Sequence, residues 1–452
     1  MKILIVGGGT VGVSICSQLA SEGHNITLVD TNTTMLTETA NKYDVFGVAG
    51  NGADISVLRK AGADKADLLI AVTSSDEINI LCCTAAKKLG TKHTVARVRN
   101  PEYNELMSLM KSDMNLSLTI NPELAAAKEI YRMFRFPSAT KIDTFFKGRV
   151  ELAQYAIKAD SPLCGITLNE LRSKLNVKFL VCAVLRGDEA HIPSGLFTLQ
   201  AGDLICFTAP EDEVTKLFKA IGAYKHPVKN ILIFGASRTT YYLQSLLKGK
   251  KISSTIIEKD PDKCRELAEQ FKCTVICNDG TKQELLAEEG LENKDAFLAL
   301  SNIDEENAIV SMYAKTQNAK KVITMIHALS YVDLFSGVGL DSIVSPKSST
   351  ATFILRYIRS ISNVHNDAEI ESLHRLLDGK VEALEFKIKE DIDGLTGIPL
   401  KELKIKRGFL IACLLHDDKV IIPTGDSIIT PSDTIIIVAV KGQIHSIKEI
   451  LK

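Results

Sequence analysis

The stretch Ile3-Leu4-Ile5-Val6-Gly7-Gly8-Gly9-Thr10-Val11-Gly12 is the most informative part of the chain. An apolar run ends at a Gly-x-Gly-x-x-Gly pattern, and an amphipathic helical pattern follows it. In this arrangement the first glycine permits a tight turn, the second lets the backbone approach a pyrophosphate, and the third lets the helix pack close to the strand. Free N–H groups at the helix start would then face the phosphates. The stretch predicts a nucleotide-binding strand–turn–helix unit.

An acidic residue follows at the expected distance. Asp30 ends the apolar segment Thr27–Asp30, about 20 positions after the glycines, where its carboxylate should accept hydrogen bonds from ribose hydroxyls. A carboxylate there repels a 2′-phosphate, so NAD(H) or ATP/ADP fits better than NADP.

Further candidate contacts follow later predicted strands, at the edge where open α/β sheets bind ligands. They are Asn51, Gly52, Thr73, Ser74 and Arg97. The first four also fit an alternative role in turns and helix caps. Arg97 shares a face of its predicted strand with Arg99, and either a phosphate contact or a solvated sheet edge suits that pair.

The unit occurs a second time at a constant offset, since 235 − 7, 258 − 30 and 307 − 79 all equal 228. The matched pairs are Gly7/Gly235, Asp30/Glu258, Gly52/Gly280, Gly62/Gly290, Thr73/Ser301, Asp76/Asp304 and Asn79/Asn307. A fixed offset over so many landmarks indicates duplicated structure. The second loop reads Gly235-Ala236-Ser237-Arg238-Thr239-Thr240, so Ser237 and Thr240 replace two glycines.

The altered loop predicts a weaker second site, a different ligand or none. Glu258 still offers the ribose contact, and Arg238 is a candidate replacement for the lost phosphate contacts. Candidate contacts of this second site are Gly235, Ala236, Ser237, Arg238, Thr239 and Glu258.

Short apolar strands alternate with amphipathic helices in both copies, which predicts an α/β fold with two Rossmann-like, doubly wound parallel-sheet N domains. A smaller β-rich α+β C domain follows each, because Leu163-x-Gly165-x-x-Leu168 recurs as Leu395-x-Gly397-x-x-Leu400. The expected domains are residues 1–138, 139–224, 228–366 and 367–452. We expect a helix over Glu123–Phe134, capped by Asn121-Pro122, and another over about Asp367–Leu377. The helix and linker between each N and C domain, Asn121–Phe136 and Asp367–Leu377, are the candidate hinges.

The composition excludes several classes of protein. A net charge of −1 gives no support for a nucleic-acid partner, and no apolar run approaches the roughly 18 residues of a membrane span. The first strand leaves no room for a signal peptide. The ten cysteines form no CxxC pair or metal-ligand array, and Cys82, Cys83, Cys273 and Cys277 are interpreted as small core residues. We therefore expect no metal site and a cytoplasmic location with reduced thiols.

No catalytic constellation is evident, because the nine histidines are dispersed and neither a nucleophile elbow nor a Walker lysine is present. An NAD-dependent oxidoreductase is the alternative hypothesis. Such an enzyme needs a substrate domain with an acid/base group, and the small β-rich units are poor candidates. A redox-sensing DNA regulator would need a basic DNA-binding surface, and the net charge near zero does not indicate one.

With these features the chain resembles the regulatory subunits of Trk-type potassium uptake systems, the TrkA family with tandem RCK (KTN) modules. The stretches that carry the resemblance are Val6–Gly12, Leu58–Asp64, Ala71–Glu77, Ala96–Pro101 and Gln283–Glu289. The resemblance implies that NAD(H) binds the N domains, with ATP and ADP as competing ligands. Carried onto this sequence, the first site comprises Gly7, Gly8, Gly9, Thr10, Val11, Asp30, Thr73, Ser74 and Arg97.

The resemblance also implies a non-enzymatic subunit that docks beneath a membrane potassium-translocating partner. The chain would be peripheral on the inner face of the cell membrane, held there by its partner and not inserted itself. Family members assemble as homotetramers, so that eight modules (2 × 4) form a ring. Ligand binding would change the angle between modules, and the ring would move the gate.

Overall fold

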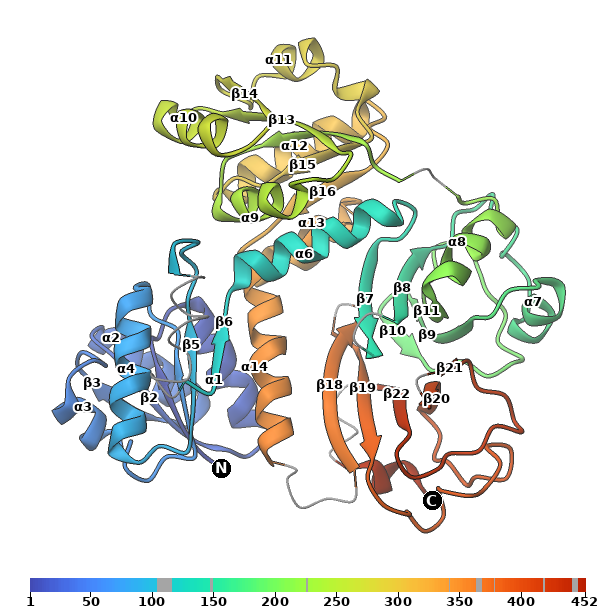
Figure 1. Cartoon of the computed structure of the whole chain (residues 1–452), viewed down its shortest axis with the longest axis horizontal. Helices are drawn as coiled ribbons and strands as arrows, with labels where there is room; N and C mark the ends of the chain where they lie inside the picture. Colours follow the sequence, from blue (N-terminus) through green and yellow to red (C-terminus); the bar gives the residue numbers. More distant parts are fainter. Residues whose placement is uncertain are drawn as a thin grey trace.

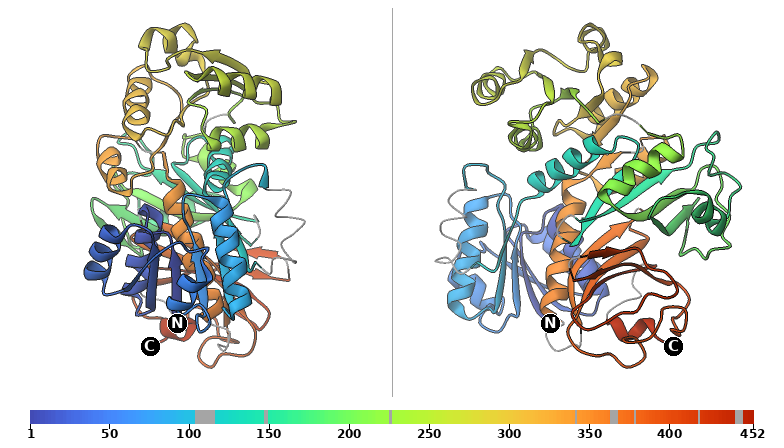
Figure 2. Two further views of the ribbon diagram at one scale, coloured as in Figure 1. Left: turned by 90° about the vertical axis from the view of Figure 1, so that its left-hand side faces the viewer. Right: turned by 45° about the vertical axis from the view of Figure 1, so that its right-hand side comes forward.

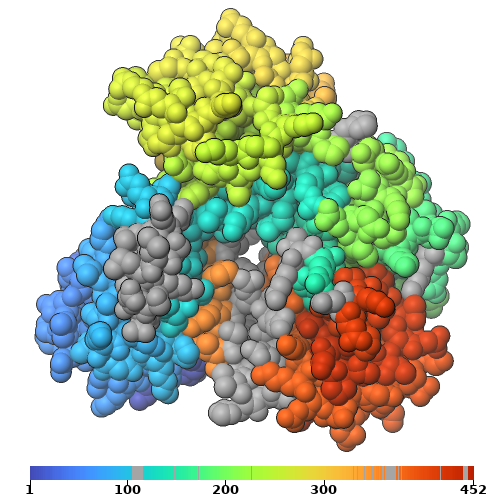
Figure 3. Space-filling view, viewed as in Figure 1, coloured from blue at the N-terminus to red at the C-terminus, as the bar shows by residue number. Residues whose placement is uncertain are grey.

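The computed structural model describes the chain except for residues 104–115, 147–148, 225–226, 341, 363–367, 378, 418 and 441–445. In the described part, two six-stranded sheets alternate along the chain with two five-stranded sheets. Figure 3 shows the resulting four lobes, with the six-stranded modules in blue and yellow and the five-stranded ones in green and red.

The first six-stranded sheet is parallel and has the order β3-β2-β1-β4-β5-β6. Its strands are β1 (Lys2–Val6), β2 (Asn25–Asp30), β3 (Phe46–Ala49), β4 (Leu68–Ala71), β5 (His93–Arg97) and β6 (Leu118–Ile120). The accompanying helices are α1 (Thr10–Ser21), α2 (Thr33–Tyr43), α3 (Ile55–Lys60) and α4 (Asp76–Leu89), followed by α6 (Pro122–Arg135). The fully buried central strand β4 agrees with the continuous apolar runs typical of parallel sheets.

The second parallel sheet repeats this order as β14-β13-β12-β15-β16-β17. Its strands are β12 (Asn230–Phe234), β13 (Ser253–Glu258), β14 (Thr274–Cys277), β15 (Ala296–Ala299), β16 (Val322–Met325) and β17 (Ile343–Val344). Its helices are α9 (Arg238–Leu247), α10 (Pro261–Gln270), α11 (Gln283–Glu288), η2 (Leu291–Asn293), α12 (Asp304–Thr316), α13 (Leu329–Gly337) and α14 (Pro346–Ser362). The duplication predicted from the constant offset is confirmed at the level of strand order.

The two five-stranded sheets are antiparallel, with orders β10-β9-β11-β8-β7 and β18-β19-β22-β20-β21. The first comprises β7 (Lys141–Phe145), β8 (Val150–Ala156), β9 (Leu180–Arg186), β10 (Glu189–His191) and β11 (Leu204–Pro210), with α7 (Leu168–Lys174) and α8 (Glu211–Ala220). The second comprises β18 (Ala368–Leu376), β19 (Val381–Ile388), β20 (Phe409–His416), β21 (Lys419–Ile421) and β22 (Thr434–Val440), with η3 (Ile447–Ile450). The α/β fold class is therefore confirmed.

The expected helix at Asp367–Leu377 is wrong, because Ala368–Leu376 is the strand β18. The register of β18 on β19 shifts between Ile370 and Ser372, which marks a β-bulge. In the sequence, Ile370, Leu373 and Leu377 stand three and four positions apart, and that spacing imitates the period of a helix. The helix predicted at Glu123–Phe134 is confirmed as α6, whose first turn is capped by Asn121 as expected.

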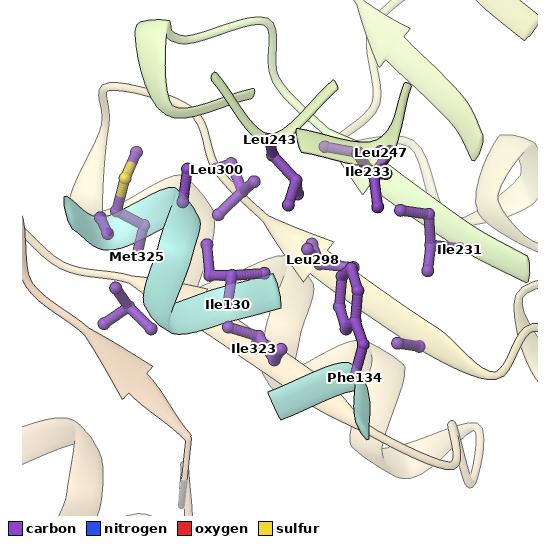
Figure 4. Packing of buried hydrophobic residues seen from close by; sticks show 14 of the residues in the cluster. Ile130, Phe134, Ile231, Ile233, Leu243, Leu247, Leu298, Leu300, Ile323 and Met325 are labelled. Carbon is purple, nitrogen blue, oxygen red and sulfur yellow. The ribbon is translucent and has the colours of Figure 1, made fainter. Parts of the chain in front are cut away.

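Two helices, α6 and α14, each pack against the parallel sheet of the other half of the chain. Helix α6, which follows the first sheet, buries Ile130 and Phe134 among strand residues of the second sheet such as Ile233 and Leu298 (Figure 4). Helix α14 makes the reciprocal crossing and buries Ile354 among residues of the first sheet. Both views in Figure 2 show orange α14 beside the blue module, and Figure 1 shows teal α6 below the yellow one. Each parallel module thus completes its core with a helix from the other half.

The two antiparallel sheets share a further core. Phe145 and Leu152 of the first pack with Leu376 and Val438 of the second in one buried cluster. The Thr208 hydroxyl donates to the Ala412 carbonyl oxygen across this junction at 2.9 Å. Each half of the chain therefore contacts the other at two levels, through the crossing helices and through these sheets.

Candidate functional site

The first glycine loop joins β1 to α1 where the strand order of the sheet reverses. Open α/β sheets bind ligands in the crevice at such a switch point. Gly7 adopts φ +105°, and a side-chain carbon there would lie 2.8 Å from the Thr73 nitrogen. At Gly12 such a carbon would lie 1.8 Å from the Gly7 carbonyl oxygen. Gly7 therefore makes the turn, and Gly12 lets α1 approach the strand.

The start of α1 is open to an anion. Gly9 occupies the N-cap position, where it has no side chain to cap the helix, and both Gly9 and Thr10 are exposed. A side-chain carbon at Gly9 would meet no described atom within 4 Å, whereas Gly8 lies beneath Met35 and Val11 is buried. The first N–H groups of a helix have no intrahelical partners, and the helix dipole favours negative charge there. The exposed backbone at Gly9 and Thr10 therefore suits a phosphate.

Asp30 lies at the end of β2 beside this loop. Its Oδ2 accepts a hydrogen bond from the Gly8 nitrogen at 2.6 Å, and its Oδ1 accepts one from the Asn32 nitrogen at 2.9 Å. A carboxylate has about four lone-pair positions, so these two bonds leave capacity for hydroxyl donors. The placement matches the acidic position that such folds direct at a ribose.

The loop after β4 forms the opposite rim, which we define as Thr73–Ser75 with Arg97. Asn79 holds it, because its Oδ1 accepts from the Thr73 nitrogen at 2.8 Å and its Nδ2 donates to the Arg97 carbonyl oxygen at 2.9 Å. The Arg97 guanidinium donates to the Thr73 carbonyl oxygen. Burial, aided by the charge of Arg99, lowers the pKa of Arg97 to about 10. Arg97 is thus a partly desolvated cation fixed at the rim.

Asn51 and Gly52 lie in the loop after β3. The exposed Asn51 accepts a hydrogen bond from the Ala53 nitrogen at 3.0 Å, as in an Asx turn. A side-chain carbon at Gly52 would lie 2.2 Å from Val6 Cγ1, so Gly52 is a packing position beneath the loop. These contacts agree with the turn role considered for both residues.

The second loop keeps the tight turn, but a capping side chain occupies the start of its helix α9. Gly235 adopts φ +93°, and Glu258 Oε2 accepts from the Ala236 nitrogen at 2.6 Å, as Asp30 does from Gly8. Ser237 is the N-cap of α9, and its hydroxyl accepts from the Thr240 nitrogen at 3.4 Å. The Thr240 hydroxyl donates to the Gly235 carbonyl oxygen at 2.7 Å. In the second loop, side chains therefore bond backbone groups that the glycines of the first loop have no side chain to bond.

The remaining predicted residues of the second loop split between surface and core. Arg238 is exposed at the first position of α9, whereas Thr239 is fully buried. Arg238 is thus the residue of this loop whose side chain is free to meet a ligand.

Comparisons with known proteins show the family of the chain. The TrkA-N domain family matches residues 3–118 and 231–346, and the TrkA-C domain family matches residues 152–222 and 384–452. The Trk system potassium uptake protein TrkA of Vibrio alginolyticus is 31% identical over 458 residues, covering 100% of this chain and 98% of that protein. A Trk system potassium uptake protein TrkA homolog of Methanosarcina mazei is also 31% identical, over 461 residues and 100% of both chains. The chain belongs to the TrkA family.

Solved structures share the fold of this TrkA family member. The GsuK channel bound to NAD aligns with a TM-score of 0.64 at 17% identity, covering 97% of this chain and 77% of that one. GsuK bound to ADP aligns with a TM-score of 0.51 at 15% identity, covering 79% of this chain and 69% of that one. Both alignments extend over more than one domain of the TrkA-type architecture.

Sequence reasoning missed a set of charged and polar residues at the boundary between the parallel modules. Glu123, at the start of α6, is partly buried, and this burial raises the pKa of its carboxyl while Arg99, Arg97 and Arg238 oppose that rise. Arg238, from the second loop, also acts on the pKa of Arg97, so the two loops face a common region. The Asn121-Pro122 cap before Glu123 indicated the position of the helix but not its neighbours.

Tyr242 of α9 links the modules directly. Its hydroxyl donates to the Arg99 carbonyl oxygen at 2.8 Å and accepts from Asn121 Nδ2 at 2.7 Å. The end of β5, the cap of α6 and the first helix of the second module are therefore bonded at one atom.

Within the described residues, no helix has both the length and the apolar character needed to cross a bilayer. The same residues contain no group of three or more histidine, cysteine or acidic side chains arranged to bind a metal ion.

Proposed function

We propose that this TrkA family member is the regulatory subunit of a potassium uptake system, and that NAD(H), ATP and ADP compete for its first glycine loop. The open start of α1 beside Asp30 carries the proposal. The second loop provides an internal comparison, because Ser237 occupies the cap position that Gly9 leaves free. The proposal assigns no catalytic step to the chain.

In the proposed complex, the pyrophosphate lies over Gly9 and accepts hydrogen bonds from the N–H groups at the start of α1. The ribose hydroxyls donate to Asp30. The rim residues Thr73, Ser74 and Arg97 close the other side, and the partly buried Arg97 cation favours a ligand with additional phosphate charge. Arg238 supplies a second cation from across the module boundary, since its charge already acts on Arg97 and Glu123.

Coupling to a gate needs two states with different ligand affinities. A ligand that pulls on the rim would move Arg97 and the adjoining Arg99, whose carbonyl oxygen is bonded to Tyr242 of the other module. Helices α6 and α14 would transmit that movement further. Helix α6 follows the first parallel sheet in the sequence but packs against the second, and α14 follows the second sheet but packs against the first. NADH and ATP would then set different angles between the two modules.

We further propose that four copies assemble into a ring of eight modules beneath a membrane potassium-translocating partner, on the cytoplasmic face. Leu81 on α4 and Ile309 on α12 support self-association. They are 58% and 62% exposed, and 309 − 81 is again 228, so the same apolar position is exposed in both modules. Single exposed apolar residues are common, but matched ones suit a repeated interface. Within each copy we propose the domain limits 1–138, 139–224, 228–366 and 367–452.

Rubidium flux into proteoliposomes tests the regulatory function. The vesicles contain the potassium-translocating subunit from the same organism, and the chain is added with NADH or with ATP. We expect flux to depend on the added chain and to differ between the two nucleotides. The Asp30→Ala variant should lose that difference, whereas a difference that survives in Asp30→Ala would contradict the assignment of the site.

A further inference from the structure

Two cysteines lie together at the rim of the second glycine loop. Cys277 ends β14 and is paired in register with Glu258 on β13. Cys264 lies on α10, and its thiol donates to the Glu258 carbonyl oxygen at 3.3 Å. The two side chains are close enough for Cys277 to act on the pKa of the Cys264 thiol. Both cysteines are therefore neighbours of the carboxylate residue that we associate with a ribose.

The two thiols have different environments. Cys264 is only 8% exposed, and burial raises the pKa of its thiol to about 12, with the neighbouring Cys277 adding to the rise. Cys277 is exposed, so its interpretation as a core residue is wrong, and Cys273 is only partly buried. Because an oxidant reaches exposed sulfur first, Cys277 is the thiol that reacts and Cys264 is the thiol placed to resolve the product.

The pair is a property of the second module alone. At the offset of 228, Cys264 corresponds to Leu36 and Cys277 to Ala49. Neighbouring landmarks such as Glu258 and Gly280 keep their counterparts Asp30 and Gly52. The first loop thus has the same framework without the thiols.

We propose that Cys264 and Cys277 form a reversible disulfide at the rim of the second loop when the protein meets a hydroperoxide. The Cys277 sulfur attacks the peroxide O–O bond, which breaks to give a sulfenic acid and, with hydrogen peroxide, one water. The Cys264 sulfur then attacks the Cys277 sulfur, the S–O bond breaks, and a second water leaves. Two thiols are oxidised and one peroxide is reduced, and a dithiol reductant reverses the reaction by exchange.

The bond would tie α10 to the end of β14 beside Glu258. It would fix the rim of the altered module while leaving the first loop untouched. This chemistry is independent of nucleotide binding, so its test does not depend on the proposed function.

The chain contains its own negative control. Cys182 and Cys206 of the first antiparallel sheet are also neighbours, because the Cys182 thiol donates to the Cys206 carbonyl oxygen at 3.2 Å. Both are fully buried in the junction between the antiparallel sheets. Proximity alone would oxidise both pairs, whereas the requirement for an exposed thiol selects Cys264 and Cys277.

The test uses the full-length chain treated with hydrogen peroxide, followed by thiol counting after denaturation and by peptide mapping without reduction. We expect titratable thiols to fall from ten to eight (10 − 2), a Cys264–Cys277 linked peptide, and recovery of all ten with dithiothreitol. The Cys277→Ser and Cys264→Ser variants should lose the bond, and Cys273→Ser should keep it. In Cys264→Ser, a sulfenic-acid trap should label Cys277.

Three results would overturn the inference: an unchanged thiol count, a link through Cys273 or Cys182, or a loss that dithiothreitol does not reverse. Peptide mapping of the wild-type chain distinguishes these results from the expected one even if a variant folds poorly.

Discussion

At the scale of single residues, the two loops show two solutions to one steric problem. A side-chain carbon at Gly12 would lie 1.8 Å from the Gly7 carbonyl oxygen. Thr240 occupies the matching position of the second loop, where its hydroxyl donates to the Gly235 carbonyl oxygen at 2.7 Å. In the second loop, a side-chain hydrogen bond therefore takes the place of the close approach of the helix to the turn. Glycine at position 12 is needed for the geometry of the first loop, whereas glycine at position 9 is needed only for its ligand.

This distinction gives a paired prediction for Gly9→Ala and Gly12→Ala. Gly9→Ala should leave the melting temperature nearly unchanged, because the new methyl group meets open space, but should weaken NADH binding by blocking the phosphate. Gly12→Ala should destabilise the first module by about 1–3 kcal/mol through overpacking, and weaken binding as well. Scanning calorimetry and ligand titration separate the two effects. Equal destabilisation by both variants would show that Gly9 has a structural role.

At the scale of elements, the crossing helices determine which part of the molecule a core mutation affects. Ile130 on α6 is buried against the second parallel sheet, although α6 follows the first sheet in the sequence. Ile130→Ala should destabilise that sheet by about 2–5 kcal/mol through the cavity it leaves. Hydrogen exchange should accelerate in β12 and β15 while β1 and β4 remain protected.

The matched control is Ile354→Ala on α14, where the pattern should reverse because Ile354 packs against the first sheet. Faster exchange in β1 and β4 for Ile130→Ala would contradict the crossed arrangement.

The elements also show how far the sequence predicts the structure. The glycine loops, the acidic residues that end β2 and β13, and the duplication follow from local patterns and a constant offset. The crossing does not, because helical periodicity shows that one face of α6 is apolar but not which sheet covers it. Helix α14 is rich in serine, threonine and aromatic residues with weak helix propensity, and it was not predicted. The exposure of Cys277 and the partial burial of Glu123 depend on neighbours that are distant in the sequence.

At the scale of the whole molecule, the junction of the antiparallel sheets contains an ion pair between the two halves. Asp143 Oδ1 on β7 lies 3.2 Å from His374 Nδ1 on β18. Burial alone would raise the pKa of Asp143, but Lys141, His374 and Arg132 together hold it well below its ordinary value. A carboxyl with a depressed pKa stabilises the fold above its unfolded pKa, about 3.9, and loses that contribution as the pH falls through its folded value.

Asp143→Asn should therefore destabilise the protein by about 3 kcal/mol at neutral pH, because positive charges at the junction lose their partner. The difference from wild type should shrink as the pH falls below about 4, where the unfolded carboxyl becomes protonated. Thermal melts across the pH range measure both effects. The control is Asp426→Asn, which removes an exposed ion pair with Lys401 and should change stability little. A stability difference between wild type and Asp143→Asn that stays constant down to about pH 3 would refute the electrostatic explanation.

The central claim for the whole molecule is that one of its two parallel modules is the principal nucleotide sensor. Calorimetric titration of NADH and ATP into the wild-type chain, Asp30→Ala and Glu258→Ala tests this claim most directly. We predict that Asp30→Ala removes the tight binding of both nucleotides and that Glu258→Ala leaves it in place. Tight binding that survives Asp30→Ala but disappears in Glu258→Ala would place the sensor in the second module and contradict the account.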